Sequence, residues 1–172
     1  TNLVSNAGVV ASDVTGVGTA RNNLAACEYG GDKGIFGFGW TGTVQSVTNL
    51  VSNAGVVATD TTGVGTGRYS LAACGYGYDK GIFAYGAAPS GKVSMSNLVS
   101  NAGVVATDVT GVGTAGTGLA ATQYGGDKGI FGFGDDGSVT AVTNLVSNTG
   151  VVATDVTGVG TARENLAACS FN

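Results

Sequence analysis

The chain is built from one repeated unit. The pentapeptide Asn-Leu-Val-Ser-Asn occurs four times, at steps of 47, 48 and 47 residues, starting at Asn2, Asn49, Asn97 and Asn144. Repeats of about 20 to 50 residues are typical of solenoids, propellers and arrays, in which one unit cannot bury its apolar face alone and neighbouring units must stack. The sequence therefore predicts a single repeat domain over residues 1–172, with copies that start near residues 2, 49, 97 and 144.

Composition argues against several classes of function. The chain has no His, which excludes Ser-His-Asp and Cys-His nucleophile systems and His-ligated zinc. Its 7 basic and 11 acidic residues give a net charge of -4 without clustered Lys or Arg, so we expect no nucleic-acid partner. Apolar stretches are broken well before the roughly 18 residues that a membrane span needs. We expect no enzymatic activity, no cofactor, no metal site and no membrane insertion.

The three Cys residues occupy the same position of three copies. They are Cys27, Cys74 and Cys169, and the third copy has Thr122 there. Equivalent positions of stacked repeats lie too far apart for a disulfide, which needs Cα atoms within about 7 Å. We interpret these residues as small buried thiols that are interchangeable with Thr. The alternative is a ring of sulfurs around a central axis that binds a soft metal.

Each copy contains four segments of β composition, separated by turn residues. In the first complete copy, segments a, b, c and d are residues 24–29, 34–39, 47–52 and 56–60. Turn sequences rich in Gly, Asp and Asn join a to b and c to d, and no helix is expected, including in residues 16–26.

Segment b has the clearest internal pattern. Period-two alternation predicts that Phe36 and Phe38 point to one face and Ile35 to the other. We expect the aromatic residues at these positions of all three complete copies to lie between stacked sheets. They are Phe36, Phe38, Phe83, Tyr85, Phe131 and Phe133.

Four short strands per copy, with Gly and aromatic residues at fixed places, are typical of a β-propeller blade. Residues 21–39 and 68–86 resemble a kelch motif, in which an Arg precedes the first strand and an aromatic-rich second strand ends in Gly. The chain departs from that family because one Gly stands where kelch has a pair and segment d lacks the usual Trp. The resemblance implies an all-β fold, a small propeller of about four kelch-like four-stranded blades with an incomplete last blade.

The last blade lacks one strand. The chain opens with segments c and d, residues 2–13, and closes with segment a alone, residues 166–171, so no segment b stands between them. Three alternatives follow. The native chain continues beyond Asn172, another molecule completes the blade, or the blade stays open. Because an unpaired strand edge recruits partners, we expect a further segment of the native chain or a neighbouring subunit to pair there.

The copies differ mainly at one end of the predicted blades. Alternating strand directions place the a–b and c–d turns on one face and the b–c and d–a loops on the other; the turns are retained between copies and the loops differ. Free drift of exposed loops explains this, and so does a ligand-facing surface. The candidate ligand-binding residues on that surface are Trp40, Arg68 and Tyr69, which offer an aromatic plate, a bidentate donor and a second ring.

Two acidic patterns have structural explanations. An Asp at the end of segment d stands eight residues before the Arg of the next copy, as in Asp60 and Arg68, and Gly116 breaks this pattern in the third copy. An ion pair or turn hydrogen bond within a blade explains the pattern better than catalytic carboxylates do. Asp135 and Asp136 are expected at a solvated hairpin tip; the alternative is that they supply oxygen ligands to Ca²⁺, for which two adjacent carboxylates are a weak signal.

The near-identity of the copies is similar to that of repeat proteins of tailed phages and marine viral metagenomes. This resemblance implies a non-enzymatic structural or binding component of a virion, such as a fibre or decoration protein, or of an extracellular surface. Its expected partners are other structural proteins or copies of itself. The alternative is a carbohydrate-binding lectin that holds surface glycans with the divergent loops.

Overall fold

The computed structural model describes residues 1–170 and is all-β. No helix occurs among these residues, including residues 16–26, as the sequence predicts. The fold consists of small antiparallel sheets, and none of them closes on itself within the described part of the chain.

Three sheets follow one another along the chain, one from each complete copy. In sheet 1, β1 (Ala25–Tyr29) and β3 (Val44–Val51) flank β2 (Lys33–Trp40); in sheet 2, β4 (Ala72–Tyr76) and β8 (Ser96–Val99) flank β5 (Lys80–Ala84); in sheet 3, β9 (Ala120–Tyr124) and β11 (Thr143–Val146) flank β10 (Lys128–Gly132). A two-stranded hairpin, β6 (Ala87–Ala88) and β7 (Gly91–Lys92), lies in the b–c loop of the second copy. The predictions for segments a, b and c of these copies are therefore confirmed.

Segment d is less regular than predicted. In sheet 1 it meets β3 only through isolated bridges, Val57 with Val51 and Thr61 with Thr48, and sheets 2 and 3 repeat this arrangement. The opening segments c and d hold a single bridge, between Val4 and Val10, and the closing segment a forms no strand over residues 166–170. These strand predictions were wrong, because a strand needs a partner along its length; Phe171 lies outside the described residues.

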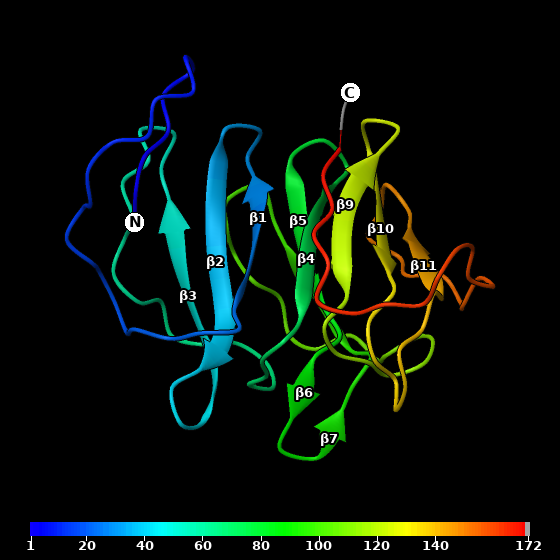
Figure 1. The fold of residues 1–172 in the computed structure, drawn as a ribbon. Helices are drawn as coiled ribbons and strands as arrows, with labels where there is room; N and C mark the ends of the chain where they lie inside the picture. Colours follow the sequence, from blue (N-terminus) through cyan, green and yellow to red (C-terminus); the bar gives the residue numbers. More distant parts are fainter. Residues whose placement is uncertain (171–172) are drawn as a thin grey trace.

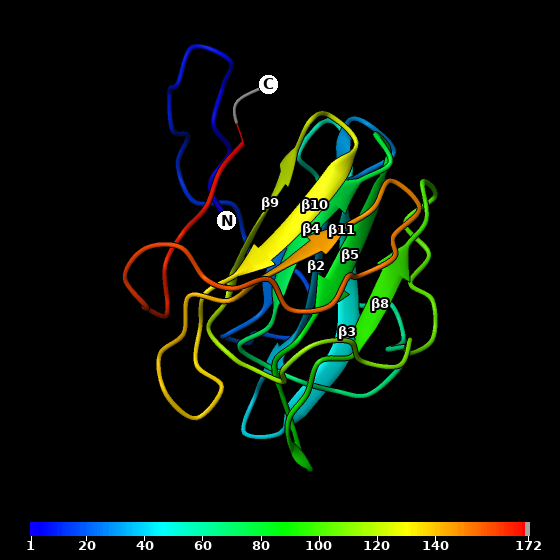
Figure 2. The same cartoon turned by 90° about the vertical axis from the view of Figure 1, so that its right-hand side faces the viewer.

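The three sheets meet along their first strands. β1 packs against β4, and β4 packs against β9. Figure 1 shows these strands near the middle of the molecule, with β3 and β11 on opposite outer sides. In Figure 2 the N-terminal hairpin and the C-terminal segment both lie on one side of the three sheets.

In β2, the middle strand of sheet 1, the side chains do not alternate between the two faces as predicted. Phe38 has a φ of 63°, and the register of β2 with β3 shifts between Gly37 and Gly39. This irregularity turns the Phe38 side chain to the face opposite Phe36. The Phe38 ring packs edge-on against Phe83 of sheet 2, with ring centroids 5.2 Å apart, whereas Phe36 lines a cavity on the other side of sheet 1. The prediction that both rings share one face was therefore wrong.

The same aromatic contact forms at both interfaces between sheets. Tyr85 packs on Phe131 of sheet 3 at 5.4 Å, as Phe38 packs on Phe83, and all four side chains are fully buried. The prediction that these aromatic residues lie between sheets is confirmed for these four. Phe36 and Phe133, on the outer faces of sheets 1 and 3, are only half-buried.

Backbone hydrogen bonds connect the start of segment a in successive copies. Ser70 N donates to Asn23 O at 2.9 Å, Gly118 N to Ser70 O at 3.1 Å, and Asn165 N to Gly118 O at 2.9 Å. All four residues have positive φ, between 50° and 64°. Successive copies are therefore joined by main-chain bonds as well as by aromatic packing.

We expect Phe83→Ala to lower the free energy of unfolding by about 3 to 5 kcal/mol, because it removes a ring packed between two sheets. Phe36→Ala is the matched control. It removes the equivalent ring from an outer face and should cost about 1 to 2 kcal/mol, since that ring is already partly hydrated. Denaturant unfolding measures both, and equal losses would contradict the stacking described here.

Candidate functional site

The repeated turns and the divergent loops lie at opposite ends of the sheets. In sheet 1 the side chain of Asn53, from the c–d turn, donates to Asp32 in the a–b turn at 3.1 Å. The same bond joins Asn101 to Asp79 and Asn148 to Asp127. This confirms that the two kinds of turn share one end of each sheet.

Trp40 and Tyr69 form an aromatic pair at the divergent end. Trp40 ends β2 and exchanges backbone hydrogen bonds with Asn22, while Tyr69 does the same with Ala87 in the next copy. The two ring centroids are 5.1 Å apart, with an interplanar angle of 53°. Trp40 is 37% exposed and Tyr69 is half-buried, so the pair presents apolar ring surface to solvent.

Arg68 does not belong to that surface. It is fully buried, and its Nη2 donates to Asn97 Oδ1 at 2.6 Å and to Phe83 O at 3.4 Å. Its guanidinium lies 4.3 Å from the centroid of the Phe38 ring. Burial lowers the pKa of Arg68 to about 10, although Asp108 opposes this shift. The expectation that Arg68 faces a ligand beside Trp40 and Tyr69 is corrected, because the side chain is buried and its Nη1 and Nη2 donate to acceptors inside the fold, while Nε has no partner among the described residues.

The Arg belongs to a polar network within its own sheet. In sheet 1, Arg21 Nη2 donates to Asn49 Oδ1 at 2.6 Å and Nη1 lies 3.8 Å from Asp60. Asn49 Nδ2 and Thr19 Oγ1 donate to the Asp60 carboxylate at 2.8 and 2.6 Å. The acidic pattern is therefore an ion pair within a sheet, as expected, but Asp60 pairs with Arg21 and not with Arg68.

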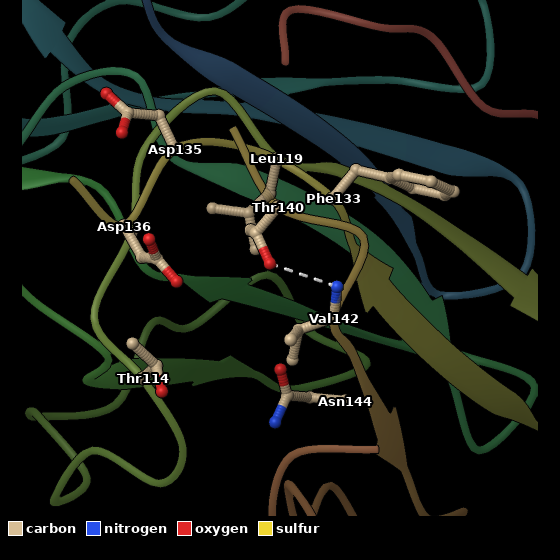
Figure 3. Close-up of a pocket in the computed structure, with 9 residues that line it drawn as sticks. Thr114, Leu119, Phe133, Asp135, Asp136, Thr140, Val142 and Asn144 are labelled. Carbon is tan, nitrogen blue, oxygen red and sulfur yellow. Dashed lines mark hydrogen bonds between the residues drawn. The ribbon is translucent and has the colours of Figure 1, made fainter. Parts of the chain in front are cut away.

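The third copy lacks this guanidinium. Gly116 stands where the other copies have Arg21, Arg68 and Arg163. Thr114 and Asn144 still donate to Asp155, at 2.6 and 2.8 Å. A pocket of about 10 Å³ takes the place of the Arg side chain, with room for about one water molecule. Figure 3 shows the Asn144 amide facing this pocket, with Thr114 and Asp136 at its rim.

Tyr85 packs against the sheet in which Gly116 replaces the Arg. It packs on sheet 3 where Phe38 packs on sheet 2, and its hydroxyl lies 3.5 Å from Val112 O. Burial, and then the charge of Asp155, raise the pKa of the Tyr85 hydroxyl, which stays protonated at neutral pH. The second interface thus combines a phenol with Gly116, whereas the first combines a phenyl ring with an Arg.

Neither proposed ion site has converging ligands among residues 1–170. Asp135 accepts from Lys92 Nζ at 2.9 Å and from Gly137 N at 2.8 Å, and its carboxylate and that of Asp136 point in different directions (Figure 3). No group of three or more His, Cys, Asp or Glu side chains in that range could hold a metal ion.

The cysteines are free thiols in three different environments. Cys27 is half-buried, Cys74 is buried and Cys169 is exposed. Burial raises the pKa of Cys74 to about 12, so its thiol is protonated at neutral pH and acts as a small packing group.

Comparison with known proteins gives no further assignment, because no protein-family model and no curated protein matches the chain. Residues 1–170 contain no helix long and apolar enough to cross a membrane.

We expect Gly116→Arg to lower the free energy of unfolding by about 1 kcal/mol. The Arg side chain must enlarge a pocket that holds about one water molecule, although Asn144 and Asp155 offer acceptors that correspond to Asn97 and Asp108 around Arg68. Gly116→Lys is the matched control. It adds the same charge without the planar fork and should destabilise more. Thermal and denaturant unfolding measure both variants, and equal effects would show that the network does not select a guanidinium.

Stability should fall in acid. Hydrogen bonds from Thr19 and Asn49 lower the pKa of Asp60, and those from Thr114 and Asn144 lower the pKa of Asp155. A carboxyl whose pKa is lower in the folded chain stabilises the fold above its unfolded value near 3.9, and this contribution is lost as pH falls through the folded value. Melting temperatures between about pH 7 and about pH 2.5 should drop below about pH 4. The Asp60→Asn variant should have a lower melting temperature at neutral pH, and its melting temperature should fall less in acid than that of the unchanged chain. An equal fall in acid would contradict this role of Asp60.

Proposed function

We propose that the chain is a non-enzymatic β-propeller module of kelch-like blades, with a structural or binding role on a virion or another extracellular surface. Sheets 1 to 3 would be three of about four blades. The observation that carries the proposal is the repetition of one set of contacts at both interfaces. Because the same contacts impose the same rotation between neighbouring sheets, further copies generate a ring or a spiral around the first strands.

The internal chemistry of the repeat also supports a scaffold role. Asp60, Asp108 and Asp155 are each held by hydrogen bonds within their own sheet, and Arg68 is buried. Charged groups that stabilise the repeat in this way are spread by its period and do not converge on a reaction centre. A rigid, weakly charged scaffold suits a fibre or decoration protein, whose partners would be other structural proteins or copies of itself.

Distances between equivalent turns test the ring. The three native cysteines are first replaced by Thr, the residue present at Thr122, and pairs of spin labels are placed at Ala54, Ala102 and Thr149, which are exposed in the c–d turns. In a ring of about four blades the 54–149 distance should be about 1.4 times the distance between neighbours, whereas a straight stack gives about 2 times. The straight-stack result would rule out the propeller. Antibody labelling of intact particles or cells from the source tests the surface location.

A second candidate function is carbohydrate binding, which the exposed Trp40–Tyr69 pair favours. Aromatic faces stack on sugar rings and contribute about 1 kcal/mol each. If a glycan array identifies a ligand, Trp40→Ala and Tyr69→Ala together should weaken binding roughly tenfold or more and leave the melting temperature nearly unchanged. Loss of stability without loss of binding would assign the pair to packing between sheets 1 and 2.

A further inference from the structure

The N-terminal hairpin sits on sheet 1 in the place of a preceding blade. Leu3 packs over Gly55, as Leu50 packs over Gly103 and Leu98 over Gly150 at the two complete interfaces. The side chain of Asn2 donates to Ala11 O at 3.0 Å and to Asp13 at 2.9 Å, which are the bonds that segments c and d make in every other copy. Segments c and d of a further blade are therefore already in position.

The C-terminal segment sits on sheet 3 in the place of a following blade. Gly134 N donates to Arg163 O at 2.9 Å, as Gly39 N donates to Arg68 O at the first interface. The Arg163 guanidinium lies 4.1 Å from the centroid of the Phe133 ring, close to the 4.3 Å between Arg68 and Phe38. The start of segment a in a further blade is therefore also in register.

No segment b lies beside either of these two pieces among residues 1–170. In sheet 1, β2 pairs with β1 on one edge and with β3 on the other. Leu-Ala-Ala-Cys enters a strand at residues 71–74 but not at residues 166–169, and Asn-Leu-Val is part of β3 at residues 49–51 but not of any strand at residues 2–4. Identical sequences thus differ in structure according to whether a segment b lies beside them.

Sheets 1 and 3 each have a cavity on the outer face, where a further segment b could pack. A cavity of about 370 Å³ adjoins Phe36, and one of about 210 Å³ adjoins Phe133 and Leu166. At the complete interfaces, an aromatic ring of segment b fills the equivalent space over Phe83 and Phe131. The two complete interfaces therefore indicate that an aromatic ring of a segment b should cover Phe36.

We propose that residues 2–4 and 166–168 form the two edges of a slot that binds an extended segment of the type Gly-Ile-Phe-Gly-Phe-Gly, supplied by a partner that carries this repeat strand. This inference rests on the proposed function, in which the blades form a ring around their first strands. The segment adds by main-chain hydrogen bonds to residues 166–168 on one edge and to residues 2–4 on the other, and its second aromatic ring stacks on Phe36. The chain is then an acceptor for strand complementation.

The test uses the whole chain and a synthetic peptide with the sequence of residues 125–137. Calorimetry should show one peptide bound per chain, with a higher melting temperature in its presence. Amide hydrogen exchange should slow at residues 2–4 and 166–168, where strands form. A peptide in which both Phe residues are replaced by Ser should not bind, and Phe36→Ala in the chain should weaken binding of the original peptide about tenfold.

Absence of binding, or equal binding of the Ser peptide, would overturn the proposal. Dimerisation of the chain that excludes the peptide would also overturn it and identify a second copy as the occupant. The spin-label distances separate the two proposals. A distance ratio of about 1.4 without peptide binding leaves the propeller standing and removes the acceptor slot, whereas a ratio of about 2 removes both.

Discussion

The packing of the three sheets depends on one left-handed residue in the middle strand of sheet 1 and on one directly after the middle strand of sheets 2 and 3. Phe38, Tyr85 and Phe133 have φ between 63° and 64°, where a bulky side chain costs on the order of 1 to 3 kcal/mol. Regular alternation would place both aromatic residues of the strand on one face. The irregular backbone instead gives each sheet one ring towards the preceding copy and one towards the next. Complete burial of a ring is worth about as much as the strain costs, so stacking in both directions maintains a conformation that an isolated strand would not adopt.

The polar network has a complementary role within each sheet. Asn49 connects the Arg before segment a to the Asp at the end of segment d, so it ties the first and last parts of a sheet that few backbone bonds hold at its outer edge. Buried polar groups are favourable only when their partners are present. The third sheet keeps the bonds between Asn144, Asp155 and Thr114 but has a small pocket instead of the guanidinium. Its neighbour Tyr85 has a hydroxyl that the equivalent Phe38 lacks, so the two interfaces differ in composition while sharing their geometry.

The sequence predicted what depends on local pattern and missed what depends on neighbours. Composition and spacing predict the period, segments a, b and c of each complete copy, and the common end of the sheets at which the turns lie. The structure contains each of these features. The face of Phe38 was mispredicted because its backbone conformation is set by packing against Phe83. Arg68 was placed on the surface because it stands next to a loop. The recurrence of an Arg and an Asn at fixed positions in the first two complete copies was the available signal of a buried pair. Residues 166–169 show the same limit, since only a paired strand gives their sequence β structure.

The divergent loops have a structural use that does not require a ligand. Trp40 and Tyr69 meet across the interface of sheets 1 and 2, and Lys92 and Asp135 meet across the interface of sheets 2 and 3. Near-identical repeats can pair out of order, because their core contacts are interchangeable. An aromatic pair at one interface and an ion pair at the other are not interchangeable, since Trp40 placed against the third copy would meet Thr117, which stands at the position of Tyr69. Loop differences can therefore specify the order of the sheets. Divergence at this end is then insufficient evidence for a ligand surface, and only the solvent-exposed part of the Trp40–Tyr69 pair remains available for recognition.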